Sequence, residues 1–255
     1  MIAATGMVAQ QTRVDVIANN LANMNTTGYQ KSRASFHDLV YQNQNRPNST
    51  KSRASGIVPS GVKAGHGVRI ADAYRIAEQG SLRQTGNALD LAIEGRGYFQ
   101  VTLPNGGTAY TRAGAFQLDQ GGQLVTADGL AVGGIAVPAN AIDVSVNRSG
   151  EVLASLPGTA LPANIGQLQL VRFPNEGALR AIGDNLYQET PSSGPAAAGI
   201  ADTPGYGSVL QGFIETSNVN PVEEITSLIQ AMRAYELNSK VIQTADQMMA
   251  TNPSR

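Results

Sequence analysis

Apolar residues near the N-terminus recur at helical spacing. Met7, Val14 and Leu21 lie seven residues apart. Ile17 and Met24 each follow one of them by three residues, so that all five lie in one stripe. This spacing predicts an amphipathic helix with a heptad-type seam. The polar run that follows ends at Gly28, a residue suited to the left-handed position that terminates a helix. We therefore assign residues 1–28 to an N-terminal helix.

The C-terminal stretch has the second helical pattern. Asn220 is a suitable N-cap, Pro221 fits the first helical position, and Glu223 stands where a capping-box acid belongs. Apolar side chains then recur at steps of mostly three, four or seven residues: Ile225, Leu228, Met232, Tyr235, Ile242 and Met249. The pattern predicts a helix within residues 220–255, about 30 residues and roughly 45 Å long.

A long helix with an apolar seam needs a partner along its length. Because the other long seam lies at the opposite end of the chain, we predict that the two terminal helices pair as a coiled coil. Together their seams form the expected self-assembly surface. Apolar positions outside the seams would face neighbouring subunits: Ile229, Val241 and Met248.

Between the two ends, the pattern changes to the alternation typical of strands. Residues 89–93 alternate, and residues 168–173 form a further apolar run. Short apolar segments also flank turn sequences at residues 104–107, 119–122 and 147–150. The spacing predicts a small all-β domain over residues 89–189, and hence an α+β fold.

Two segments rich in turn-forming residues join the predicted β domain to the helices. Residues 29–88 include a stretch rich in Asn, Ser, Pro and Gly, and residues 190–219 are rich in Pro, Gly, Ala and Ser. We expect both to be extended connectors.

Composition narrows the class of protein. A net charge of -1 over 255 residues argues against a general nucleic-acid binder. The chain has no cysteine, which excludes disulfides and thiolate metal sites. No run of about 20 apolar residues predicts a membrane span. The first eleven residues lack a basic n-region, so we expect export, if any, without a cleaved signal peptide.

The sequence offers no pattern for catalysis, a metal or a cofactor. His37 and His66 have no ligand spacing to other groups. The Gly95-Arg96-Gly97 fragment lacks the third glycine and the lysine of phosphate-binding loops, which favours turn glycines. Acids in the β region are scattered, at Asp90, Glu94, Asp119, Asp128 and Asp143. We therefore expect a non-enzyme without a metal ion or cofactor.

The early connector has an unbalanced charge. Between Asp38 and Asp72 there is no acid, whereas five bases occur: Arg46, Lys51, Arg53, Lys63 and Arg69. A solvated loop would account for this bias. The functional alternative is contact with acidic surfaces of neighbouring subunits, or with the cell wall.

Three long stretches resemble the flagellar axial family of rod and hook proteins. They are residues 18–29 (ANNLANMNTTGY), residues 89–99 (LDLAIEGRGYF), and a C-terminal stretch that runs from Glu215-Thr216-Ser217-Asn218-Val219-Asn220 to Asp246-Gln247-Met248. Further matches to distal-rod members fall at residues 38–42, 59–62, 65–69 and 185–190, so the resemblance covers essentially the whole chain.

The resemblance implies a structural subunit that self-assembles into the straight, rigid hollow shaft of the bacterial flagellar distal rod. It implies that the terminal helices line the inner tube, and that export uses the flagellum's own type III apparatus. Implied partners are further copies of the chain, proximal rod proteins, the hook protein and the L and P ring proteins. The segment associated with straightness would fall within residues 43–67.

Three other functions are compatible with parts of the sequence. Another axial protein, either a proximal rod protein of similar length or a hook subunit, shares the same pattern. A cell-wall hydrolase would need an acid pair in a cleft. A non-flagellar β-rich binding module would leave the two terminal seams unexplained.

Overall fold

The structure is a computed structural model that describes residues 2–39, 41–43, 63–65, 67–158 and 161–251. The chain divides into two compact units. The helical unit comprises Met1–Asn19, Ser32–Tyr74 and Val222–Arg255, and the β unit comprises Asn20–Lys31 and Arg75–Pro221. Two helices and a large β-rich central region confirm the predicted α+β class.

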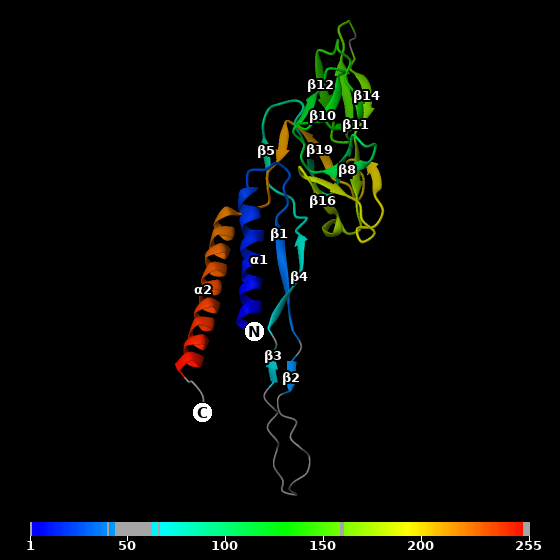
Figure 1. The fold of residues 1–255 in the computed structure, drawn as a ribbon. Coiled ribbons are helices and arrows are strands. Elements are labelled where there is room, and N and C mark those ends of the chain that lie inside the picture. The colour runs from blue at the N-terminus through cyan, green and yellow to red at the C-terminus, as the bar shows by residue number, and fades with distance from the viewer. Residues whose placement is uncertain (1, 40, 44–62, 66, 159–160, 252–255) are drawn as a thin grey trace. The chain divides into compact units, whose positions relative to one another are not determined.

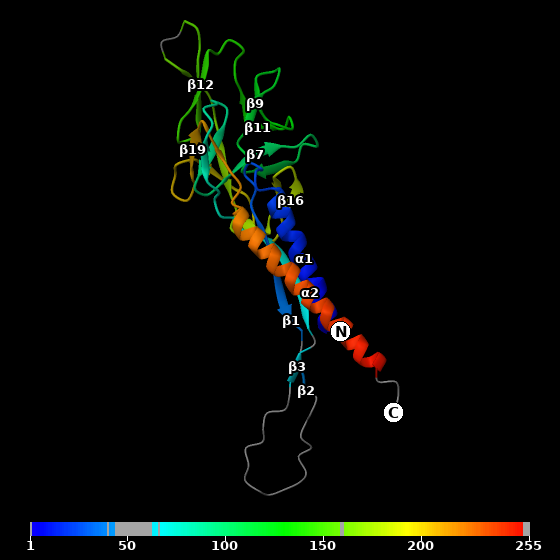
Figure 2. The ribbon, with the colours of Figure 1, turned by 90° about the vertical axis from the view of Figure 1, so that its left-hand side faces the viewer.

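The two predicted terminal helices are present. They are α1 (Ile2–Ala22) and α2 (Pro221–Thr251), and they run side by side in opposite directions (Figures 1 and 2). They come close at Gly6, where a Cβ would lie 3.0 Å from Asn238 Nδ2. Pro221 occupies the first helical position of α2 as predicted, and Glu223 and Glu224 in the first turn favour the helix dipole.

Gly28 does not terminate α1 as we expected. The helix ends at Ala22, and turns follow in which the Asn23 amide donates to Asn20 O. Gly28 does have positive φ, 69°, but six residues later. There a Cβ would lie 2.6 Å from the Ala113 amide nitrogen, so glycine is required by close backbone approach in the β unit.

The early connector forms a two-stranded ribbon in the helical unit (Figure 1). β1 (Ser32–Asp38) pairs with β4 (Val68–Arg75). β2 (Tyr41–Asn43) pairs antiparallel with β3 (Lys63–Gly65). The sequence predicted an extended connector here but not the pairing of its strands. Most of the expected straightness segment, residues 44–62 and 66, lies outside the described residues.

The β unit contains a nine-stranded sheet with the path β16-β17-β8-β7-β11-β10-β9, with β15 paired to β7 and β18 paired to β15. Its strands are β7 (Tyr98–Thr102), β8 (Thr108–Thr111), β9 (Phe116–Leu118), β10 (Gln123–Thr126), β11 (Ala131–Ala136), β15 (Gln169–Arg172), β16 (Arg180–Gly183), β17 (Leu186–Gln188) and β18 (Ala197–Ile200). A 3₁₀ turn, Glu176–Ala178, precedes β16.

The remaining strands form smaller sheets around it. They are β5 (Leu82–Gln84), β6 (Leu91–Glu94), β12 (Asp143–Val146), β13 (Glu151–Ser155), β14 (Ala163–Gln167), β19 (Ser208–Gln211) and β20 (Phe213–Glu215). β12, β13 and β14 form an antiparallel sheet, while β19 pairs with β6 and β20 with β5. Every strand predicted between residues 89 and 173 is present, but the segment expected as a return connector contributes β18, β19 and β20.

Strand β7 separates two apolar clusters. Phe99 belongs to the larger cluster and packs edge-on against Phe116, with ring centroids 5.2 Å apart. Tyr98 points the other way, into a smaller cluster with Phe173 and Tyr187. Both faces of β7 are therefore covered: Tyr98, Phe99 and Val101 are buried, and Gln100 between them is half-buried.

Phe99→Ala should destabilise the β unit by about 3–5 kcal/mol, since it leaves a cavity in the larger cluster. Urea unfolding followed by circular dichroism measures the loss. Leu118→Ala, at an exposed position of β9, is the matched control and should change stability by about 0.5 kcal/mol or less. Equal losses in the two variants would contradict the assigned core.

Candidate assembly interface

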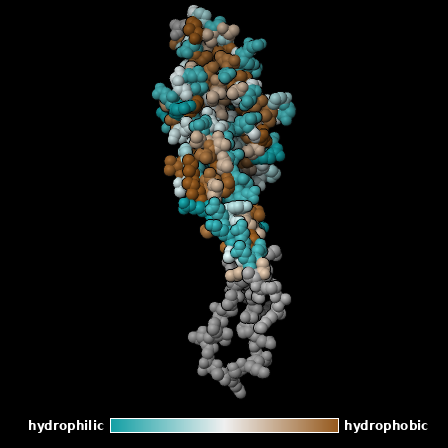
Figure 3. Space-filling model, turned by 60° about the vertical axis from the view of Figure 1, so that its left-hand side comes forward, coloured by the Kyte–Doolittle hydropathy of each residue, from teal (hydrophilic) through white to brown (hydrophobic). Residues whose placement is uncertain are grey.

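Helix α2 exposes apolar side chains on the flanks of its covered face. Toward the covered side lie Leu228, Ala231, Asn238 and Ile242, of which Ala231 is completely buried. The exposed large apolar side chains are Val222, Ile225, Ile229, Met232, Tyr235, Leu237, Val241 and Met248. Figure 3 shows hydrophobic residues at several places on the molecular surface. A helix that is apolar on more than one face is typical of a helix buried on several sides.

Seven of the eight exposed apolar side chains of α2, all but Tyr235, fall into two groups at helical spacing. Val222, Ile225, Ile229 and Met232 follow one flank of the first half of the helix. Leu237, Val241 and Met248 follow the other flank of the second half. Met248, the most exposed of these three, has 70% of its surface accessible. Each group is an apolar surface that is exposed to solvent in the single chain.

The predicted seam residues are distributed over both kinds of position. On α1, Ile17 is buried and Met7, Val14 and Leu21 are half-buried, while Met24 follows the end of the helix and is exposed. On α2, Leu228 and Ile242 are half-buried, whereas Ile225, Met232 and Tyr235 are exposed. The side chain of Met249 lies outside the described residues. Their role in a self-assembly seam stays a prediction.

The predicted basic contacts are mostly beyond the described part of the chain. Arg46, Lys51 and Arg53 are not described, and Lys63 is described only in its backbone. Arg69 is exposed on β4. His37 is exposed on β1. Contact of the basic residues with neighbouring subunits therefore also stays a prediction.

A buried ion pair lies in the β unit beside the segments that connect it to the rest of the chain. Arg112 Nη2 is 2.7 Å from Glu215 Oε2, and the two side chains are only 5% and 2% exposed. Arg112 Nη1 also donates to the carbonyls of Gly95 and Gly97, at 2.9 and 2.8 Å. Glu215 Oε1 accepts from the Gly80 amide at 3.0 Å. The sequence gives no sign of this pair, because no local pattern joins residues 103 positions apart.

Tyr98 lies near this pair and contacts the segment that follows α1. Its hydroxyl is 3.5 Å from Gln30 Oε1 and 3.4 Å from Glu176 Oε2. Burial, reinforced by the Glu176 carboxylate and opposed by Arg75, raises the pKa of Tyr98 to about 12. Burial likewise raises the pKa of Tyr187, whose ring stacks under the Arg75 guanidinium at 3.7 Å.

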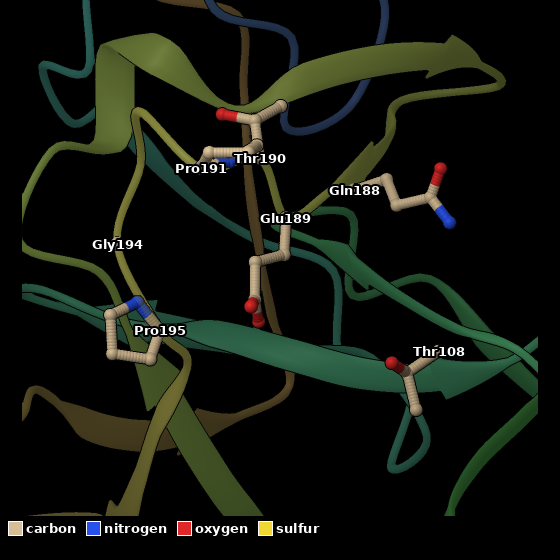
Figure 4. A pocket seen from close by; sticks show the side chains of 7 residues that line it. All are labelled: Thr108, Gln188, Glu189, Thr190, Pro191, Gly194 and Pro195. Carbon is tan, nitrogen blue, oxygen red and sulfur yellow. The ribbon is translucent and has the colours of Figure 1, made fainter.

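The described residues contain little that could support chemistry. They include no group of three or more His, Cys, Asp or Glu side chains able to hold a metal ion. An open pocket of about 560 Å³ is lined by Thr108, Gln188, Glu189, Thr190, Pro191, Gly194 and Pro195 (Figure 4). Its single acid, Glu189, accepts a hydrogen bond from the Ala196 amide. None of the described helices is long and apolar enough to cross a membrane.

Three family models match the chain. "Flagella basal body rod protein" matches residues 1–30, "Flagellar hook protein FlgE/F/G D1 domain" matches residues 92–154, and "Flagellar basal body rod FlgEFG protein C-terminal" matches residues 210–251. The first match spans α1 and Gly28, and the last spans Glu215 and all of α2.

Relatives described as "Flagellar basal-body rod protein FlgG" match almost the whole chain. The Caulobacter vibrioides protein is 53% identical over 97% of this chain and 95% of its own length. The Agrobacterium fabrum protein is 48% identical over 97% of this chain and 95% of its own length. The Bacillus subtilis protein is 39% identical over 96% of this chain and 94% of its own length. The chain belongs to the FlgG family of flagellar basal-body rod proteins. This FlgG-family chain is thus a structural axial protein of the flagellar basal body, and none of the matching families is a catalytic one.

Replacing Tyr98 by Phe should flatten the alkaline side of the stability profile. The wild-type phenol has a pKa of about 12 when folded, against about 10 when unfolded. Its contribution is therefore fully present below pH 10 and lost as the pH rises from 10 through 12. Tyr98→Phe should lose up to about 3 kcal/mol less stability than wild type over this interval.

Urea unfolding at pH 9, 10, 11 and 12 measures this difference. Tyr74→Phe removes a hydroxyl from an exposed side chain and serves as the matched control. Parallel profiles for wild type and Tyr98→Phe would show that Tyr98 ionises freely in the folded chain.

Proposed function

We propose that this chain is a subunit of the flagellar distal rod that polymerises through its terminal helices into a straight, rigid hollow shaft. The shaft transmits torque across the periplasm and lets export substrates pass through its centre. The observation that carries the proposal is the apolar surface of α2, which remains exposed although one face of the helix is covered. In an FlgG-family chain, copies of the same chain are the natural occupants of that surface.

In this proposal the inner part of the subunit is a coiled coil of α1 and α2. Their antiparallel arrangement and the close approach of Gly6 to Asn238 support the pairing. The helical unit contains this inner domain, and the β unit, which includes residues 20–31, 75–88 and 190–219 as well as residues 89–189, forms the outer domain. The apolar groups on α2 then pack against neighbouring subunits.

Stiffness follows from the number of contacts. Burying an exposed Ile, Leu or Met side chain contributes at most about 1.5–3 kcal/mol. When each subunit contacts several neighbours in this way, bending requires many such contacts to slip together. The basic residues of the early connector, from Arg46 to Arg69, add contacts with acidic surfaces of neighbours. Proximal rod proteins, the hook protein and the L and P ring proteins are the further partners.

Ile229→Asp should abolish assembly, since it places a charge in the proposed subunit interface, where burial of an unpaired charge is costly. Ile142→Asp makes the same change at a residue of the β unit that is 74% exposed, and it should assemble like wild type. Electron microscopy of the concentrated proteins, together with swimming of cells in which each variant replaces the native subunit, measures the outcome. Normal filaments and motility with Ile229→Asp would refute the proposed interface.

Deletion of residues 43–67 should yield curved or polymorphic filaments, because this segment is proposed to fill gaps between protofilaments. The curvature of filaments in electron micrographs is the measurement. A variant with the same composition but a shuffled order of these residues separates the effect of sequence from that of length. Straight filaments from the deletion variant would show that this segment is not needed for stiffness.

A further inference from the structure

The chain passes between the two units four times. The passages fall between residues 19 and 20, 31 and 32, 74 and 75, and 221 and 222. The β unit therefore contains three segments that lead to passages: residues 20–31, the stretch that begins at Arg75, and the stretch that ends at Pro221. The passages leave the β unit from fixed positions only if contacts inside the unit hold these three segments together.

The side chain of Asn218 joins all three segments. It belongs to the last segment, and its Oδ1 accepts from the Lys31 amide at 2.7 Å. Its Nδ2 donates to the carbonyls of Ile76 and Glu78, at 3.1 and 2.9 Å. The Ile76 amide in turn donates to Lys31 O at 2.9 Å. One primary amide thus uses its acceptor and both donors on main-chain groups of the other two segments.

Glu215 makes a second set of links between the same segments. Its main-chain carbonyl accepts from the Gly28 amide at 2.8 Å, and its side chain accepts from the Gly80 amide at 3.0 Å. The ion pair with Arg112 ties these links to the core of the β unit. A carboxylate buried at this depth keeps its position only while its partners stay in place.

Thr216 completes the arrangement. Its amide and its Oγ1 both donate to Ser81 O, each at 2.9 Å. Glu215, Thr216 and Asn218 therefore make hydrogen bonds to residues 28–31 and 76–81. We call these three residues the collar. They lie in the Glu215–Asn220 stretch that the resemblance singled out without giving it a role.

We propose that the collar is a mechanical joint that holds the three segments in one fixed arrangement within the β unit, so that the chain passages after Lys31, before Arg75 and after Pro221 leave it from fixed positions. Apart from the ion pair between Glu215 and Arg112, the bonds of the collar run to main-chain groups of the segments rather than into the apolar clusters. In a rod of the kind proposed above, torque between the helices and the β unit passes through this joint. This role in torque transmission rests on the proposed function, whereas the joint itself is a property of the single chain.

Asn218→Asp tests the joint on the unassembled full-length chain. The substitution keeps the acceptor for the Lys31 amide but turns a carboxylate oxygen toward the carbonyls of Ile76 and Glu78, which repels them. Hydrogen exchange followed by mass spectrometry should show amides of residues 28–31 and 76–81 exchanging at least tenfold faster. Peptides from β7 and β8, residues 98–111, should keep wild-type protection.

Asn140→Asp is the matched control, because it makes the same change at an exposed loop residue of the β unit. It should leave both sets of peptides unchanged. Unaltered exchange at residues 28–31 and 76–81 in Asn218→Asp would overturn the proposal, and so would an equal acceleration in Asn140→Asp.

Thr216→Val decides the matter if Asn218→Asp loses protection throughout the β unit. It removes the Oγ1 bond to Ser81 and introduces no charge. Faster exchange confined to residues 76–84 supports a local joint, and wild-type protection there overturns it. Because none of these measurements requires assembly, a chain that failed to form filaments would still give a clear answer on the joint.

Discussion

The buried ion pair between Arg112 and Glu215 is the constraint on which the arrangement of the β unit depends. Removing two charges from water costs several kcal/mol per ion, so such a pair persists only with good geometry and further hydrogen bonds. Here Arg112 donates to two glycine carbonyls as well as to the carboxylate. Glu215 accepts from the Gly80 amide in addition. The pair therefore stabilises the fold only while four separate segments keep their positions.

The glycines around the ion pair follow from its geometry. Gly95 and Gly97 have φ values of 109° and 141°, in the region that side chains rarely adopt. This backbone path aims both carbonyls at the Arg112 guanidinium. The Gly95-Arg96-Gly97 fragment, which by sequence alone is a pair of turn glycines, thus supplies two hydrogen-bond acceptors to Arg112. Tyr98, the next residue, is the first of β7. Its side chain lies in the smaller apolar cluster, and that of Phe99 lies in the larger one.

Sequence patterns predicted the elements whose own residues dictate their structure. Helix α2 has a proline at its start and acids in its first turn, and most strands between residues 89 and 173 flank clear turn sequences. Strands β11 and β14 in the same range were not predicted. In contrast, β18 reads Ala-Ala-Gly-Ile, which has little strand propensity, and it forms because β15 offers a partner edge. The ribbon of β1 and β4 was missed for the same reason, since pairing across about 30 residues leaves no local signal.

The assembly surface was predictable only in part. Ile229, Val241 and Met248 were identified as lying outside the seam, and all three are exposed. Heptad counting also placed Met232 in the seam, whereas the covered side of α2 in the single chain centres on Ala231. A small residue allows closer approach of a neighbouring element than a large one, and only the packed structure shows where such an approach occurs. The ion pair and Asn218 were beyond reach, because their partners are distant in sequence.

The extent of exposure on α2 bears on the kind of assembly that it supports. Among the described residues, eight large apolar side chains of this helix are exposed, most of them by about half. Covering the exposed half of such a side chain contributes on the order of 1 kcal/mol, so the helix as a whole offers roughly 8 kcal/mol. Association costs about 4–15 kcal/mol in lost freedom of motion before any side chain is ordered.

A single pairwise contact through α2 is therefore marginal. The two flanks of the helix face different directions, so one neighbour covers only one of them. Both are covered when several copies surround each subunit, and the cost of ordering a copy is then shared among contacts to all its neighbours. An exposed helix of this kind favours a polymer over a dimer, as the proposed function requires.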